Sequence, residues 1–279
     1  MVFLPVYDYN PLRYIKRPYV TWALLASNIL IYFLFQSGLV WNLDDMLNRL
    51  FGFMPASILA GAGRPSDVPA LIAEAPGIKL FTYMFLHGDL AHLFGNMIFL
   101  WVFGDNVEDA MGRFRYFLFY IACGVAAGLA HFLSAQTSQT PLIGASGAIS
   151  GLLAAYLVLF PRAKIWVLFF TRIPIKLRAY WVLLLYLGFN IFMASMRGMD
   201  NVAWWAHIGG FGAGLILVFM MRRPEIGLFK GEPDTVAAVA GTATVSPVAP
   251  VEQGATEAAV PAIDAPTVIV RVDRPKDQP

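Results

Sequence analysis

The feature of this sequence that most restricts its fold is a run from Tyr116 to Pro161 without a single Asp, Glu, Lys or Arg. About 20 helical residues cross a hydrocarbon core of roughly 30 Å, so this run suits two crossings joined by a neutral loop around residues 134 to 143. Three further charge-free stretches each suit one crossing: Pro18 to Leu43, Ala179 to Met196 and Asn201 to Met221. The absence of charge therefore predicts five crossings.

A sixth apolar stretch, Leu80 to Gly104, differs from the others because it carries His87, Asp89, His92 and Asn96. Such polar groups are unfavourable in a bilayer unless they have a function. Composition supports a lipid environment, since 58% of the residues are apolar and 14% are charged, whereas soluble domains carry about 25% charged residues. We expect an all-α, polytopic membrane protein that forms a six-transmembrane-helix bundle.

The basic residues predict the orientation of this bundle, because Lys and Arg are retained on the cytoplasmic side of short loops. They gather in three places: Arg13 to Arg17, Arg162 to Arg178, and Arg222 with Arg223. This distribution places both termini in the cytoplasm. After Arg223 the sequence is rich in Ala, Val, Pro and Thr and has no evident core. The predicted parts are an N-terminal segment (1–18), a six-helix domain (19–223) and a disordered tail (224–279).

Charge and cysteine content argue against several classes of function. The net charge of +2 is distributed according to topology and gives no reason to expect nucleic acid as a partner. Cys123 is the only cysteine, which excludes an intrachain disulfide and suits a small buried hydrophobe. Zinc binding by His87, His92 and His207 is disfavoured because no Glu or Cys joins them at ligand spacing. We expect no metal and no cofactor.

Four polar side chains of the predicted spans converge in depth. Ser146 and His207 each lie 15 positions above a cytoplasmic end, at Pro161 and Arg222, or about 22 Å at 1.5 Å per residue. His92 lies about 20 Å up its own helix by the same count. Asn96 is four residues further on, and therefore on the same face. A hydrated cavity at this level would satisfy all four groups.

Ser146 and His207 have the chemistry of a nucleophile and its general base, because a hydroxyl becomes reactive when a neighbouring imidazole takes its proton. The fourth span begins just after Gly144, inside the predicted membrane. The free N–H groups of such a helix start can stabilise an oxyanion. Close approach of two helices requires small residues at the contact. Such residues recur at helical spacing on both helices: Gly147 and Gly151, and Gly210 and Gly214.

These motifs resemble those of the rhomboid family of intramembrane serine proteases, in its bacterial six-helix form, over residues 19–223. The matching residues are Gly144-Ala145-Ser146-Gly147, then His87, His92 and Asn96, then Ala206, His207, Gly210 and Gly214. The resemblance implies a Ser146–His207 dyad, with His92, Asn96 and the Ser146 amide stabilising the oxyanion. It also implies an enzyme of the bacterial inner membrane that cleaves single-pass membrane proteins near the outer boundary of the bilayer.

Some positions depart from the family pattern or carry weaker expectations. The first external loop has no Trp-Arg pair, and Ser150 stands four residues after Ser146, where an aromatic residue is common in the family. The segment Gly104 to Gly112 also resembles the family and is expected to form a structural turn. His87 is expected to be a hydrogen-bonding loop residue without a catalytic role. No carboxylate suits a third catalytic position, because Asp89 is on another helix and Asp200 in the fifth loop.

Two functions from other classes stay open. A rhomboid-fold chaperone or dislocation factor would bind membrane clients without cutting them, although the intact Ser146 and His207 argue against it. A transporter could use the same polar cavity, but the sequence shows no inverted repeat and few charges within the spans.

Overall fold

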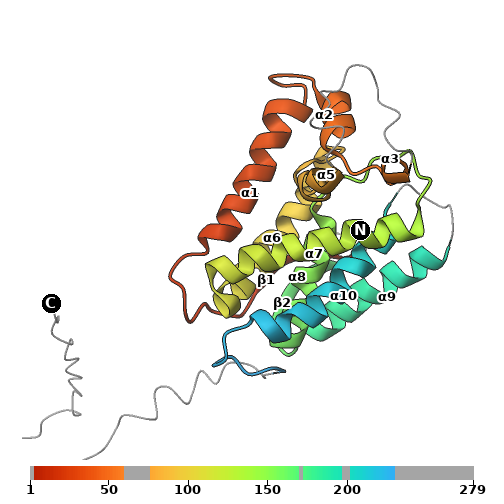
Figure 1. Ribbon diagram of the computed structural model, residues 1–279. Helices are drawn as coiled ribbons and strands as arrows, with labels where there is room; N and C mark the ends of the chain where they lie inside the picture. Colours follow the sequence, from red (N-terminus) through yellow and green to blue (C-terminus); the bar gives the residue numbers. More distant parts are fainter. Residues whose placement is uncertain (1–2, 60–75, 170–171, 197–201, 230–279) are drawn as a thin grey trace, which may run out of the picture. The chain divides into compact units, whose positions relative to one another are not determined.

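The computed structural model describes residues 3–59, 76–169, 172–196 and 202–229, and most of them are helical (Figure 1). In the first half, the elements are β1 (Phe3–Asp8), α1 (Tyr19–Ile31) with a π-helical extension (Tyr32–Gln36), α2 (Asp44–Phe51), α3 (Ala56–Leu59), α5 (Pro76–Thr82), a 3₁₀ turn (Tyr83–Phe85), α6 (Leu90–Met111) and α7 (Arg113–Ser134). In the second half they are α8 (Ser146–Leu159), β2 (Lys164–Phe169), β3 (Ile173–Arg178), α9 (Ala179–Ser195) and α10 (Trp204–Met221).

Three helices of the described residues are long and apolar enough to cross a membrane: Tyr19–Gln36, Arg113–Ser134 and Trp204–Met221. α8 and α9 are apolar but shorter. Large apolar side chains such as Leu133 and Ile216 face outward, as they do on helices surrounded by lipid. The protein is therefore an all-α polytopic membrane protein, as the sequence predicted. The count of six crossings stays a prediction.

The centre of the bundle is α8, in which every residue from Gly147 to Tyr156 is buried. α10 packs against both α7 and α8. Glycine sets the spacing between α8 and α10, because a Cβ added to Gly210 would overlap the carbonyl oxygen of Gly147. Cys123 of α7 lies beside Gly151 and is fully buried, which confirms its predicted role as a small hydrophobe. These backbone contacts bring the start of α8 close to the start of α10.

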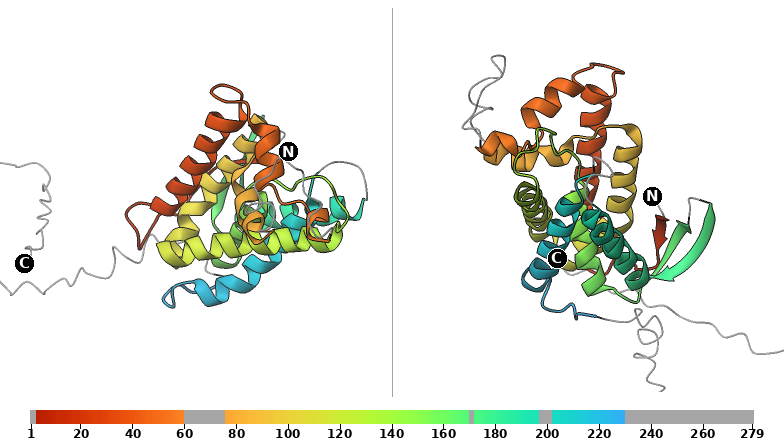
Figure 2. Two further views of the ribbon diagram at one scale, coloured as in Figure 1. Left: turned by 45° about the horizontal axis from the view of Figure 1, so that its top comes forward. Right: turned by 90° about the vertical axis from the view of Figure 1, so that its right-hand side faces the viewer.

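A three-stranded antiparallel sheet in the order β1-β2-β3 was not predicted from the sequence. It stands at one side of the helices in the right-hand view of Figure 2. Along β2 the side chains of Ile165 and Val167 are buried, while those of Trp166 and Leu168 are partly exposed, the alternation of a strand with one covered face. β3 ends at Arg178 and leads directly into α9. The basic loop after α8 is thus a hairpin that pairs with the N-terminal segment.

The prediction of a structural turn from Gly104 to Gly112 is wrong, because α6 continues to Met111. Gly112 then ends the helix with a φ of 81°, a left-handed conformation that glycine adopts without strain. The buried carboxylates of Glu108 and Asp109 lie on this last turn. They act as hydrogen-bond acceptors for a distant part of the chain, which explains why charged residues are held inside the fold.

The N-terminal segment is held by backbone N–H groups that donate to those two carboxylates. Glu108 accepts from the amides of Val20 and Thr21, at 3.1 and 2.8 Å. A carboxylate at the first turn of α1 also interacts favourably with the helix dipole. Asp109 accepts from three consecutive amides, at 2.7 to 2.9 Å: Arg13, Tyr14 and Ile15.

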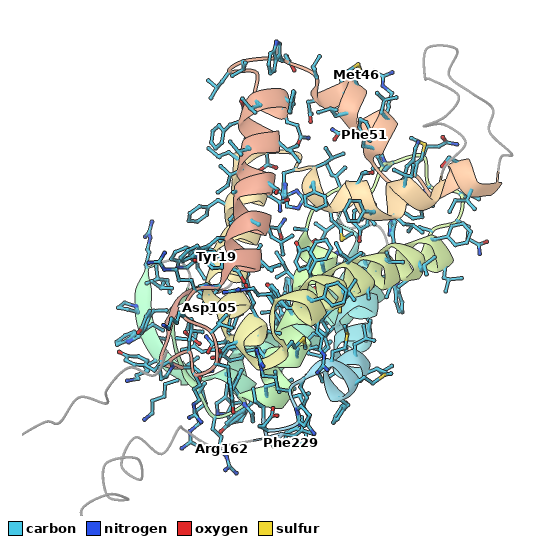
Figure 3. All side chains as sticks on the ribbon, turned by 60° about the vertical axis from the view of Figure 1, so that its left-hand side comes forward. Tyr19, Met46, Phe51, Asp105, Arg162 and Phe229 are labelled. Atoms are coloured by element: carbon cyan, nitrogen blue, oxygen red, sulfur yellow. The ribbon has the colours of Figure 1, made fainter. Side chains whose placement is uncertain are left out.

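Figure 3 shows the two ends of the bundle. Met46 and Phe51 of α2 lie at the opposite end of α1 from Tyr19, whereas Arg162 and Phe229 lie beyond Tyr19 at the other end. Residues 224 to 229, the start of the predicted tail, pack on this end. Ile226 is buried, and the Phe229 amide donates to the carbonyl oxygen of Val158 at 2.9 Å. The rest of the predicted tail lies outside the described residues.

Candidate active site

The structure brings Ser146 and His207 into direct contact. Ser146 is the first residue of α8, and His207 lies in the first turn of α10. His207 Nε2 is 2.8 Å from Ser146 Oγ, and both side chains are half-buried. The contact of Gly147 with Gly210 lies next to this pair and fixes the helix separation that it requires. A hydroxyl and an imidazole at this distance can exchange a proton.

The backbone just before Ser146 has a conformation that only glycine adopts easily. Gly144 has a φ of 112°, and its amide donates to the carbonyl oxygen of Tyr83 at 2.9 Å. A Cβ at Gly144 would lie 2.6 Å from His92 Nε2. Ala145 is the residue before the helix, and among the described residues no side chain caps the N–H groups of the first turn of α8. These donors remain available beside the Ser146 hydroxyl.

His92 and Asn96 of α6 approach the same place from another side. Asp89 caps α6 by accepting from the His92 amide at 2.8 Å. Asn96 is 6% exposed, and its Nδ2 has no hydrogen-bond partner among the described residues. That nitrogen lies 3.6 Å from the Cβ position of Gly144. An unpaired buried N–H group is unfavourable, so this amide is ready to donate to an incoming oxygen.

His87 lies in the loop before α6 and contacts His92. It is fully buried, and its ring lies 5.1 Å from that of His92 in an edge contact. Its backbone N–H donates to Gln36 Oε1 at 3.1 Å. Within the described ranges, no group of three or more His, Cys, Asp or Glu side chains could hold a metal ion. Asp200, which was weighed as a third catalytic group, lies outside those ranges.

Two residues of α9 contact the site although sequence reasoning did not single them out. Asn190 Oδ1 is 2.7 Å from His207 Nδ1. Tyr186 places its ring 6.5 Å from that of His207 and its hydroxyl 2.6 Å from Ser150 Oγ. Asn190 is a buried amide in an apolar helix. The criterion that drew attention to Asn96, a polar side chain within a predicted span, would also have found Asn190.

Residues 76–224 match the family model of the Rhomboid domain. This chain belongs to the rhomboid family. It is 32% identical over 194 residues to RHOMBOID-like protein 5 of Arabidopsis thaliana, which covers 66% of this chain and 60% of that protein. It is 30% identical over 216 residues to Rhomboid protease GluP of Bacillus subtilis, covering 76% of this chain and 37% of that protein.

A more distant relative is Rhomboid protein 1, mitochondrial, of Saccharomyces cerevisiae, at 26% identity over 202 residues, or 71% of this chain and 51% of that protein. This rhomboid thus aligns with 37 to 60% of the length of these three relatives. Family membership and the apolar helices make it an integral membrane protein. They support a function of the intramembrane protease type.

Proposed function

We propose that this rhomboid is an intramembrane serine endopeptidase in which Ser146 is the nucleophile and His207 the general base. The observation that carries the proposal is the 2.8 Å separation between Ser146 Oγ and His207 Nε2. His207 takes the hydroxyl proton as Oγ bonds to the substrate carbonyl carbon. It then gives that proton to the leaving amine as the C–N bond breaks. Water, activated by the same imidazole, hydrolyses the acyl-enzyme and restores Ser146.

The negative charge that develops on the substrate carbonyl oxygen has three donors in reach: the Ser146 backbone N–H, the His92 ring and the Asn96 amide. The unpaired Nδ2 of Asn96 supports this assignment, because a donor left without a partner in the free enzyme gains one in the transition state. Gly144 supports it as well, since the absence of a Cβ leaves space beside His92. The site thus stabilises charge without a metal or cofactor taking part in any proposed step.

The substrates we propose are transmembrane segments of single-pass proteins, cut near the extracytoplasmic boundary. A folded helix buries its peptide groups in hydrogen bonds, so a substrate must unwind locally before Oγ can reach a carbonyl. Segments with helix-breaking and small residues unwind most easily. The proposed orientation in a bacterial inner membrane, with both termini in the cytoplasm, puts the start of α8 towards the outer surface. The name of the Bacillus relative, a rhomboid protease, supports the same class of reaction.

The test is cleavage of a panel of transmembrane peptides by the purified protein in detergent, together with labelling by a fluorophosphonate probe. We expect Ser146→Ala and His207→Ala to abolish cleavage and Ser146→Ala to abolish labelling. Ser27→Ala is the matched control, because the partly exposed Ser27 donates its hydroxyl to the Ala23 carbonyl oxygen of its own helix, α1. Cleavage that survives Ser146→Ala refutes the assignment. An unlabelled, inactive wild type that binds the peptides would instead support a non-proteolytic client-binding role.

A further inference from the structure

The imidazole of His207 is hydrogen-bonded at both of its nitrogens. Nε2 contacts Ser146 Oγ at 2.8 Å, and Nδ1 contacts Asn190 Oδ1 at 2.7 Å. Asn190 is only 2% exposed, so this second contact is shielded from water. Three helices therefore meet in one chain of hydrogen bonds, in which α9 holds the side of the ring that faces away from the serine.

The orientation of the Asn190 amide is fixed by its other contact. Its Nδ2 donates to the carbonyl oxygen of Tyr186 at 2.7 Å, one helical turn earlier on α9. A carbonyl oxygen can only accept, so the NH₂ end of the amide must face Tyr186. The oxygen end therefore faces His207. This settles an assignment that amide geometry alone leaves ambiguous.

The amide in turn selects the tautomer of His207. An amide oxygen cannot donate, so the hydrogen bond to Asn190 requires the proton to be on Nδ1. A neutral imidazole carries one ring proton, which leaves the Nε2 lone pair pointing at the Ser146 hydroxyl. That is the form in which His207 can accept the serine proton. In the opposite tautomer the proton is on Nε2, and the buried oxygen of Asn190 would face the lone pair of Nδ1, an unfavourable contact.

The face of α9 that carries Asn190 is also hydrogen-bonded to α8, through Tyr186. Asn190 and Tyr186 are four residues apart and therefore share a face. The Tyr186 hydroxyl bonds Ser150 Oγ at 2.6 Å, and Ser150 also donates to the Ser146 carbonyl oxygen at 2.8 Å. The Tyr186 ring lies at 31° to the His207 ring. α9 thus gives the imidazole a ring neighbour and a hydrogen-bond acceptor, and Ser150 leaves room for that ring.

We propose that Asn190 is a positioning residue, which holds His207 in the Nδ1–H tautomer and so prepares Nε2 to receive the Ser146 proton. The inference rests on the proposed protease function and adds a third group to it. When Nε2 takes the serine proton, Nδ1 keeps its own proton and continues to donate to Asn190 Oδ1. A neutral amide suits this place better than a carboxylate, because it avoids an unpaired charge within the bilayer.

The test compares steady-state kinetics of Asn190→Ala and Asn190→Asp across pH in detergent. We expect Asn190→Ala to lower kcat by about 10- to 100-fold with KM within threefold. The loss is smaller than the roughly 10⁴-fold effect of replacing a triad Asp by Asn, because that change imposes the wrong tautomer whereas alanine leaves both tautomers accessible. Asn190→Asp keeps an acceptor and should restore activity at high pH. The introduced carboxylate favours the protonated imidazole. The acid limb of the kcat–pH profile of this variant should therefore lie at higher pH than that of the wild type.

Asn28→Ala is the matched control, since Asn28 of α1 is also fully buried and also donates to a carbonyl four residues earlier, Leu24, at 2.8 Å. It should leave kcat and the pH profile unchanged. Equal kcat losses in the two alanine variants, or an unshifted profile in Asn190→Asp, would overturn the proposal. The tautomer itself is read from ¹⁵N chemical shifts of His207 in the resting enzyme. Because this measurement needs no turnover, it tests the positioning role even if the proposed protease activity fails.

Discussion

Gly214 of α10 lies against the carbonyl oxygen of Gly151 of α8, so closely that a Cβ on Gly214 would overlap that oxygen. One helical turn nearer the active site, Gly210 meets Gly147 in the same way. Because Ser146 directly precedes Gly147, this contact sets how near α10 brings His207. The two glycine pairs therefore determine a catalytic distance as well as a packing distance.

Replacing Gly210 with alanine should separate α8 from α10 and lengthen the contact between Ser146 and His207. A displacement of about 1 Å in a reacting pair lowers the rate by about 100-fold. We expect a loss of that size in kcat for Gly210→Ala, measured on a transmembrane peptide in detergent. The control is Gly212→Ala on the same helix, where an added Cβ meets nothing within 4 Å. Equal activity in the two variants would contradict the distance argument.

Replacing Asn96 with alanine tests the oxyanion donors. Loss of one such donor lowers kcat by about 10² to 10³-fold. We expect this for Asn96→Ala, with KM nearly unchanged, because Nδ2 has no partner among the described residues and so gains its bond in the transition state. Thermal unfolding should show little loss of stability, since the Nδ2 group that is removed makes no hydrogen bond with the described residues. A rise in KM with unchanged kcat would instead assign Asn96 to substrate binding.

Much of this arrangement could be predicted because helices have a constant rise and a constant period. The depth of Ser146 and His207 follows from counting residues, and the shared face of His92 and Asn96 follows from their spacing of four. The glycines mark the faces that touch. Absence of charge locates apolar helices without any knowledge of their partners. All of these are local properties of single segments.

What could not be predicted depends on contacts between distant segments. The hydrogen bond between Asn190 and His207 forms only if α9 turns the face that carries Asn190 towards α10. The sequence of α9 alone does not specify which face that is. The sequence analysis predicts a structural turn from Gly104 to Gly112, but Glu108 and Asp109 are helical and buried as acceptors for amides some 90 residues earlier in the chain. β1 gains its strand only by pairing with β2. The aromatic neighbour of His207 is Tyr186 of α9, whose hydroxyl bonds Ser150, and the spacing of residues along α8 could not show this.

Replacing Gly144 with alanine should impair catalysis in two ways. The φ of 112° is strained for any residue with a side chain, and the new Cβ would lie 2.6 Å from His92 Nε2. We expect the displaced loop to lower both kcat and labelling of Ser146 by a fluorophosphonate. Gly88→Ala is the control, because its Cβ would make an ordinary contact of 3.5 Å with Ile143. Unchanged labelling in Gly144→Ala would show that the loop tolerates the side chain.

The attachment of the N-terminal strand should depend on pH through Asp8, which lies outside the spanning helices. Asp8 Oδ2 accepts from the Tyr156 hydroxyl at 2.6 Å and from Asn106 Nδ2 at 2.9 Å. Burial raises the pKa of Asp8 from 3.8 to about 7, against the opposing effect of the Tyr156 hydrogen bond, and the nearby Asp105 adds to the rise. The buried carboxyl group is therefore more easily kept in its protonated form.

The sign of this effect follows from proton binding. Between about pH 4 and pH 7 the docked strand binds more protons at Asp8 than the detached strand, so docking weakens as pH rises through that window and changes little above it. Hydrogen exchange of the β1 amides is measured in detergent and corrected for the intrinsic rate at each pH. The protection of these amides should fall as the pH rises through this window. Asp8→Asn keeps an acceptor for both donors and carries no charge, so its protection should fall less steeply with pH than that of the wild type. A variant that loses protection as steeply as the wild type would exclude Asp8 as the titrating group.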